Sequence, residues 1–183
     1  WQPDCAATAL TYDAEDDVWQ GAFPMQPGDD QDKQGGRYKA TLDGGWGENY
    51  GLNAQRGGGD IPLTVTEATT VKFYYDHKSH WVADSVNQRI VTVVGDFQTQ
   101  LGCAAGNDPG CLRTCLQDPD GDGVYALVTA SLLAGTYQAQ AAINETLAEV
   151  YGGPDGAPVA FTVADDGDEI YFAFDPVNNQ LLV

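Results

Sequence analysis

The residues of this chain with the clearest chemical potential surround a tryptophan in the glycine-rich segment DGGWGENYG. They form what we call the Trp46 group: Lys39, Trp46, Glu48, Asn49 and Tyr50. A flat apolar sugar face stacks on an indole ring, and nearby carboxylate, amide and ammonium groups form hydrogen bonds with sugar hydroxyls. The group therefore predicts a carbohydrate-binding surface. The alternative is that Trp46 packs back over the edge of a sheet.

A second set of polar residues lies in the turn DPDGDG, where Asp118, Asp120 and Asp122 alternate with other residues. Carboxylates at this spacing, with glycine allowing a tight turn, resemble the first half of a calcium-binding loop. The bidentate glutamate of a complete helix-loop-helix site is missing at its usual distance. The turn is a candidate calcium site, with an acidic hairpin that holds no metal as the alternative. We expect no other cofactor.

A third cluster, DHKSHW, contains both histidines of the chain, His77 and His80, together with Lys78 and Trp81. Two histidines three residues apart reach one metal if the backbone turns, yet no third ligand is evident. Packing of these residues at the boundary between two domains is the favoured interpretation.

The chain offers little for catalysis. Its carboxylates cluster in turns, where solvated acids are ordinary, and it contains no Gly-x-Ser-x-Gly motif and no nucleophile at a typical spacing from a histidine. We therefore expect no enzymatic activity.

The net charge limits the partners. With 27 acidic and 8 basic residues the formal charge is -19, which repels nucleic acid and anionic membranes. It suits cations and neutral polymers such as glycans, or simply solvates the surface. No apolar run approaches the roughly 20 residues that span a bilayer, and no charged-then-apolar signal segment opens the chain. We expect neither nucleic-acid binding nor membrane insertion.

The four cysteines indicate an oxidising compartment. Cys103 and Cys111 bracket a flexible loop rich in Gly, Asn, Asp and Pro, and we predict a disulfide between them. Cys5 and Cys115 have no obvious partner. Without a Cys-x-x-Cys pair a zinc site is not expected.

The sequence repeats itself. The segment from Trp1 aligns with the segment from Asn107 at an offset of 106 residues, which places Cys5 on Cys111 and Leu10 on Leu116. A second block, from Tyr38, aligns with Ala139 onward at an offset of 101 residues. A third block sets IPLTV above APVAF and VKFYYD above IYFAFD. This order indicates a duplication, with copy one at residues 1–86 and copy two at residues 87–183.

Both copies have the pattern of β-sandwiches. Short runs rich in β-branched and aromatic residues, such as RIVTVVGDF and EIYFAFD, alternate with Gly, Pro and Asp clusters. The stretch ASLLAGTYQAQAAINETLAEV has helical propensity, but Gly135 interrupts it and its counterpart in copy one cannot be helical. The fold class is therefore all-β, with two tandem antiparallel β-sandwich modules.

Copy one lacks an element that copy two has. Copy two begins with RIVTVVGDFQTQLGC, a strand and turn that place Cys103 before Cys111, whereas copy one begins after the corresponding position. Three interpretations stay open: the chain is part of a longer protein, a neighbouring subunit supplies the strand, or the module tolerates its loss.

Several blocks together resemble the accessory modules that flank the catalytic domain of bacterial pullulanases and amylopullulanases, and modules of cell-surface starch-binding proteins. These blocks are GDFQTQLGC, DPGCLRT, LTYDAEDDVWQG, YKATLDGGWGENYG, IPLTV and FYYDHKSHWV. The resemblance implies an immunoglobulin-like sandwich, an extracellular or cell-surface location, α-glucan binding in some members and no catalytic machinery. It points to the Trp46 group as the binding residues.

Copy two has lost this chemistry, because Leu147 replaces Trp46, Gln140 replaces Lys39 and Val150 replaces Asn49. The leading hypothesis is thus a non-catalytic pair of modules that binds α-glucan mainly through copy one. The alternative is a structural subunit of an extracellular filament or surface layer, in which a neighbour's strand completes copy one and the subunits self-assemble.

Overall fold

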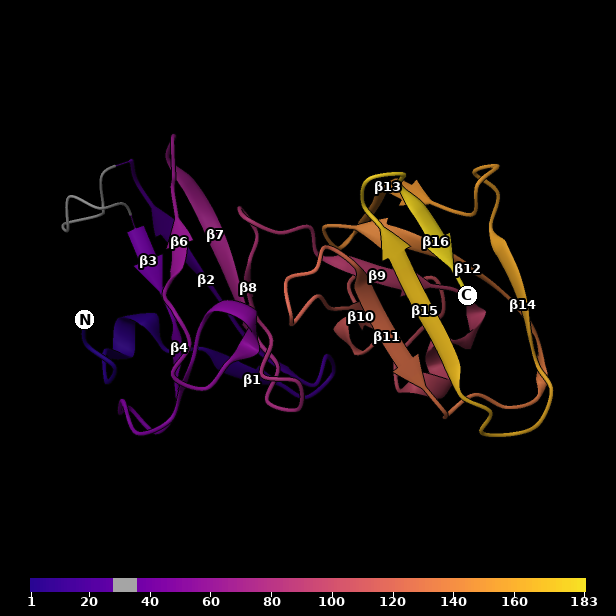
Figure 1. The fold of residues 1–183 in the computed structure, drawn as a ribbon, viewed down its shortest axis with the longest axis horizontal. Coiled ribbons are helices and arrows are strands. Elements are labelled where there is room, and N and C mark those ends of the chain that lie inside the picture. The colour runs from indigo at the N-terminus through magenta and orange to yellow at the C-terminus, as the bar shows by residue number, and fades with distance from the viewer. Residues whose placement is uncertain (28–35) are drawn as a thin grey trace. The chain divides into compact units, whose positions relative to one another are not determined.

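The computed structural model describes residues 1–27 and 36–183, which divide into two compact units. Unit 1 comprises residues 1–13, 18–88 and 119–121, and unit 2 comprises residues 14–17, 89–118 and 122–183. The regular structure of the described residues is antiparallel β-strand with short 3-10 helices (Figure 1). The predicted all-β fold of sandwich modules is confirmed. No helix in the described part of the chain is long and apolar enough to cross a membrane.

Unit 1 is built on one four-stranded sheet of order β1-β2-β7-β8, with two small two-stranded sheets, β3-β6 and β4-β5. Its elements are η1 (Ala6–Thr8), β1 (Thr11–Asp13), β2 (Val18–Met25), β3 (Gly36–Tyr38), β4 (Ala40–Thr41), β5 (Asn49–Tyr50), η2 (Leu52–Ala54), β6 (Ile61–Leu63), β7 (Thr69–Tyr75) and β8 (Val82–Asp84). Tyr50 and Ile61 from the small sheets pack with Tyr75 and Val82 from the large one. This packing forms a sandwich core.

A buried carboxylate ties these sheets together. Asp84, at the end of β8, is fully buried, and its Oδ2 accepts a hydrogen bond from the Tyr38 hydroxyl of β3 at 2.7 Å. Its Oδ1 accepts from the backbone N–H groups of Val86 and Asn87. The Asn87 amide donates both to Asp84 and to the carbonyl of Pro62 in β6. Burial raises the pKa of Tyr38 well above its ordinary value, so its hydroxyl stays a donor.

Unit 2 buries more of its described apolar residues than unit 1 does. A five-stranded sheet follows the order β10-β9-β12-β13, with β14 also paired to β12, and a three-stranded sheet follows β11-β15-β16. Its elements are β9 (Val91–Val94), η3 (Asp96–Leu101), η4 (Leu112–Thr114), β10 (Cys115–Leu116), β11 (Tyr125–Thr129), β12 (Gly135–Ile143), β13 (Thr146–Tyr151), β14 (Val159–Val163), β15 (Ile170–Asp175) and β16 (Gln180–Leu182). The stretch with helical propensity thus forms β12 and β13, as predicted from Gly135. Phe97, Phe172 and Phe174 are fully buried in its centre.

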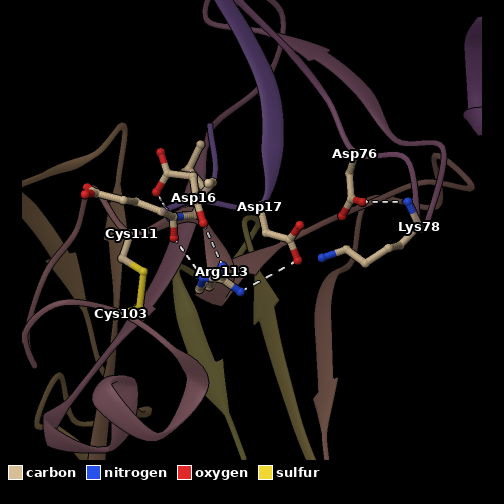
Figure 2. A network of polar contacts seen from close by, with 10 residues as sticks. Asp16, Asp17, Asp76, Lys78, Cys103, Cys111 and Arg113 are labelled. Carbon is tan, nitrogen blue, oxygen red and sulfur yellow. Dashed lines mark hydrogen bonds and ion pairs between the residues drawn. A yellow bond between two sulfur atoms is a disulfide. The ribbon is translucent and has the colours of Figure 1, made fainter. Parts of the chain in front are cut away.

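Arg113 organises one end of unit 2. Its guanidinium donates to the backbone carbonyls of Ala14 and Glu15 and lies 3.7 Å from the Asp17 carboxylate. The adjacent N–H of Leu112 donates to Asp16 (Figure 2). These bonds explain why residues 14–17 belong to unit 2, although they lie in the sequence of copy one.

Strand registers confirm the duplication. Trp19 pairs with Tyr75, and their counterparts Tyr125 and Phe174 pair in the same way. Likewise Ala40 pairs with Tyr50 in unit 1, as Ala141 pairs with Tyr151 in unit 2. Residues with left-handed backbone also recur: Asp43 and Gly44 match Asn144 and Glu145, and His80 matches Asn179.

The third sequence block needs a correction of two residues. Tyr38 pairs with Ile61, and its counterpart Ala139 pairs with Val159. IPLTV therefore corresponds to VAFTV and not to APVAF. The sequence alignment was wrong here because Pro and Gly dominate the preceding loops and give no register signal.

We predict that Asp84→Ala lowers the free energy of unfolding of unit 1 by about 3 kcal/mol, since it leaves several buried donors unpaired, and that Tyr38→Phe costs about 1 kcal/mol. All four tryptophans, Trp1, Trp19, Trp46 and Trp81, lie in unit 1. Urea unfolding followed by tryptophan fluorescence therefore measures this unit. The double variant should lose less free energy of unfolding than the two single variants do together. Full additivity of the two losses would contradict the Tyr38–Asp84 hydrogen bond.

We also predict that Gly152→Ala destabilises unit 2, because a Cβ there would lie 1.9 Å from the backbone oxygen of Ala157. Relief requires a backbone shift that costs roughly 2 kcal/mol. The neighbouring Gly153→Ala is the control, since its Cβ would meet only ordinary contacts. Urea unfolding followed by circular dichroism should separate the two variants, and equal midpoints would disprove the steric account.

Candidate carbohydrate-binding surface

Trp46 lies at the tip of the hairpin between β4 and β5. Left-handed backbone at Asp43 and Gly44 turns the chain, and the N–H of Leu42 donates to the carbonyl of Glu48. The side-chain amide of Asn49 donates to the Trp46 carbonyl at 3.0 Å. The loop is thus closed by its own hydrogen bonds, and it holds an indole that is 44% exposed.

A second tryptophan lies beside the first. The ring centroids of Trp1 and Trp46 are 5.8 Å apart in an edge-to-face arrangement, and Trp1 is also exposed. The guanidinium of Arg37 lies over the Trp1 ring at 5.7 Å. Two exposed rings therefore adjoin a cation. This pair could not be predicted, because Trp1 is far from Trp46 along the chain and belongs to no shared motif.

Lys39 occupies a more covered position than the loop residues. Its side chain is 12% exposed, and its Nζ lies 3.9 Å from the carboxylate of Asp60. Arg37 lies 3.4 Å from the same carboxylate. Lys39 therefore contributes an ammonium already paired with Asp60, and the partly exposed Asp60 joins the candidate surface as a residue that sequence reasoning missed.

Tyr50 supports the surface from below. Its ring is buried, with 5% exposure, and stacks on His80 with centroids 4.0 Å apart. Its hydroxyl donates to Glu48 at 2.8 Å, and this bond raises the pKa of Tyr50. The structure thus brings the Trp46 group and the histidine cluster together at one stack. Of the predicted group, Trp46 is clearly exposed, Glu48 and Asn49 are partly so, and Tyr50 is packed.

The histidine cluster is a packed network. The Tyr75 hydroxyl lies 3.1 Å from Nδ1 of His77 and 3.2 Å from Nδ1 of His80, so it donates to one ring and accepts from the other. Burial raises the pKa of Tyr75. Trp81 is buried and its ring centroid lies 6.1 Å from that of Tyr74. Lys78 donates its backbone N–H to Asp76, in the turn visible in Figure 2. Within the described residues, neither histidine joins a group of three or more metal ligands.

The equivalent hairpin of unit 2 keeps the supporting tyrosine but has no tryptophan at its tip. Tyr151 donates to Glu149 at 2.7 Å, as Tyr50 does to Glu48. At the tip, Leu147 is 53% exposed and Val150 is 38% exposed. The partly exposed Gln140 stands in place of Lys39. This hairpin presents aliphatic side chains where unit 1 presents an indole.

The acidic turn brings its three carboxylates together. Ligand oxygens of Asp118, Asp120 and Asp122 lie within 4.8 Å of one another. Asp118 also accepts hydrogen bonds from the backbone of Asp122 and Gly123, which close the turn. The calcium site stays a prediction.

The disulfide predicted between Cys103 and Cys111 is present, and Figure 2 shows it beside Arg113. Neither Cys5 nor Cys115 is part of a disulfide.

Comparisons with known proteins agree with the repeat. The chain is 30% identical over 145 residues to an amylopullulanase of Thermoanaerobacterium saccharolyticum, covering 74% of this chain and 11% of that protein. It is 35% identical over 80 residues to an amylopullulanase of Thermoanaerobacterium thermosulfurigenes, covering 44% of this chain and 4% of that protein. The chain therefore spans a small part of these relatives.

A solved pullulanase from Bacillus acidopullulyticus aligns with 96% of this chain and 17% of its own length, at 23% identity and a TM-score of 0.46. Residues 1–82 and residues 90–181 each match the pullulanase X25 domain. Because these two segments cover most of the sequence, the chain belongs to the pullulanase X25 domain family and contains two copies of that domain.

Proposed function

We propose that this chain is a non-catalytic, α-glucan-binding part of an extracellular starch-active polypeptide, and that it binds through unit 1. The observation that carries the proposal is the exposed Trp46 indole on a hairpin closed by its own hydrogen bonds. Membership of the pullulanase X25 domain family supports the α-glucan ligand, and the amylopullulanase relatives support a larger parent protein. The Cys103–Cys111 disulfide supports an extracellular location.

The binding chemistry follows from the surface as built. Trp46 and Trp1 supply apolar faces against which pyranose rings stack, displacing water from both. Glu48 and Asp60 offer carboxylate acceptors for sugar hydroxyls, and Arg37 offers donors. Because the hairpin is preorganised, little conformational entropy is lost when a glycan binds. Lys39 and Tyr50 hold this arrangement through Asp60 and Glu48.

The structural-subunit alternative has less support. In that alternative a neighbouring copy gives unit 1 its β9, a strand whose Val91 and Val93 are fully buried in unit 2. Extraction of this strand would open the unit 2 core, at a cost of several buried side chains. Self-assembly in solution is therefore not the function we propose.

We expect isothermal titration with maltoheptaose to show heat for the intact chain. Trp46→Ala should weaken binding by about tenfold or more, since it removes a stacking contact worth over about 1.4 kcal/mol. The matched control is Leu147→Ala, which truncates the equivalent exposed residue of unit 2 and should leave the affinity unchanged. No heat with the intact chain, or equal losses in both variants, would sink the proposal.

For the acidic turn we predict that calcium raises the thermal unfolding midpoint of the chain at constant ionic strength, because an ion that binds only the folded state stabilises it. Asp120→Asn should abolish this rise, since Asp120 contributes one of the three clustered carboxylates. Magnesium is the control for charge screening. Equal shifts with both ions, or a shift that survives Asp120→Asn, would identify the turn as an acidic hairpin without a specific calcium site.

A further inference from the structure

Strand β9 has a position in unit 2 with no counterpart among the described residues of unit 1. It pairs on one side with Gln140–Ile143 of β12 and on the other with Cys115–Leu116 of β10. The residues of unit 1 equivalent to these two edges are 39–42 and 9–10. In the described part of unit 1, no strand pairs with either segment on the corresponding side. Two strand edges therefore flank a vacant strand position.

Apolar residues at this position are less covered than their counterparts. Leu116, Ala141 and Ile143 of unit 2 are fully buried against β9 and its neighbours. Their equivalents Leu10, Ala40 and Leu42 are only half-buried in unit 1. Unit 1 keeps apolar residues at these positions, but no strand among residues 1–27 and 36–88 covers them, so this surface is a partly uncovered core.

The polar and sulfur groups around β9 show the same contrast. In unit 2 the buried Gln98 amide donates to the hydroxyl of Thr114, and Cys103 is bonded to Cys111. The equivalents of Thr114 and Cys111 are Thr8 and Cys5. Thr8 is exposed and Cys5 is a half-buried free thiol. Unit 1 thus retains the hydroxyl that would accept the hydrogen bond and the cysteine that would form the disulfide.

We propose that unit 1 takes up one further β-strand from outside these 183 residues, and that a cysteine carried by this strand forms a disulfide with Cys5. The occupant has the chemistry of Arg89–Cys103: a β-branched strand, a glutamine that reaches Thr8, and a cysteine eight residues before Cys5 in the combined register. It adds main-chain hydrogen bonds to residues 39–42 and covers Leu10 and Leu42. A second copy of the chain does not suit this role, because its β9 is already buried at the centre of unit 2.

The proposal is tested with a synthetic peptide of residues 89–103 whose cysteine is linked to glutathione. The Cys5 thiolate attacks the peptide sulfur, the Cys5–peptide disulfide forms, and glutathione leaves as its thiolate, so the exchange needs no other oxidant. We expect one peptide adduct, which peptide mapping places on Cys5. Cys115 is buried and serves as the comparison within the same molecule.

The matched control is the same activated peptide with Val91→Asp and Val93→Asp. Docking should make the native peptide react about tenfold or more faster than this control, through its raised effective concentration at Cys5. Cys5→Ser should abolish the adduct. Equal rates for both peptides, or dimerisation through Cys5 that the peptide does not suppress, would overturn the proposal.

A second variant tests the same idea within one chain. Residues 89–106 placed directly before Trp1 set the added cysteine eight residues before Cys5, the separation found between Cys103 and Cys111. We expect the new disulfide to form and the fluorescence-detected unfolding midpoint of unit 1 to rise. A free Cys5 in material whose Cys103–Cys111 bond is intact would count against the proposal. Neither test involves glucan, so its outcome is independent of the proposed function.

Discussion

The strand β9 is the constraint on which the rest of unit 2 depends. It pairs on both sides, with β10 and β12, and its four residues are buried. The following segment adds the buried Phe97, which stacks on Phe172 of the opposite sheet. Because β9 forms backbone hydrogen bonds with a strand on each side and its side chains fill the core, it determines the size of that core. Unit 1 has no such strand among its described residues, and fewer of its described apolar residues are buried than in unit 2.

Unit 1 is held together by a different device. The buried Asp84 carboxylate joins β8 to β3 and, through Asn87, to β6. Its counterpart in the duplicated register is Val183, so unit 2 has no equivalent of this carboxylate. Both oxygens of the Asp84 carboxylate accept hydrogen bonds, and these bonds hold the sheets of unit 1 together. In unit 2 the sheets are held together by buried apolar side chains. The two copies therefore share strand registers and turns while relying on different interactions for closure.

Much of this architecture could be predicted from the sequence because it depends on local pattern. β-branched runs gave the strands, the interruption at Gly135 excluded a helix, and the loop between Cys103 and Cys111 indicated their disulfide. The Asp84 anchor and the Tyr50–His80 stack could not be predicted, because each joins residues that are distant in sequence and carry no shared spacing. The pairing of Trp1 with Trp46 escaped for the same reason. Sequence pattern identifies elements, and their contacts follow only from the packed fold.

The vacant strand position and the glucan surface are linked through β4. Residues 39–42 form the edge that an added strand would pair with, and the same residues lead directly into the hairpin that presents Trp46. Lys39, at the start of that edge, pairs with Asp60 beneath the surface. Pairing on this edge would restrict the backbone on which the indole is mounted and lower the entropy lost when a glycan binds. In unit 2 the corresponding edge, Gln140–Ile143, pairs with β9. The hairpin that follows this edge carries the exposed Leu147 in place of an indole. The chemistry of the hairpin tip therefore differs between the two copies, with an indole in unit 1 and an aliphatic side chain in unit 2.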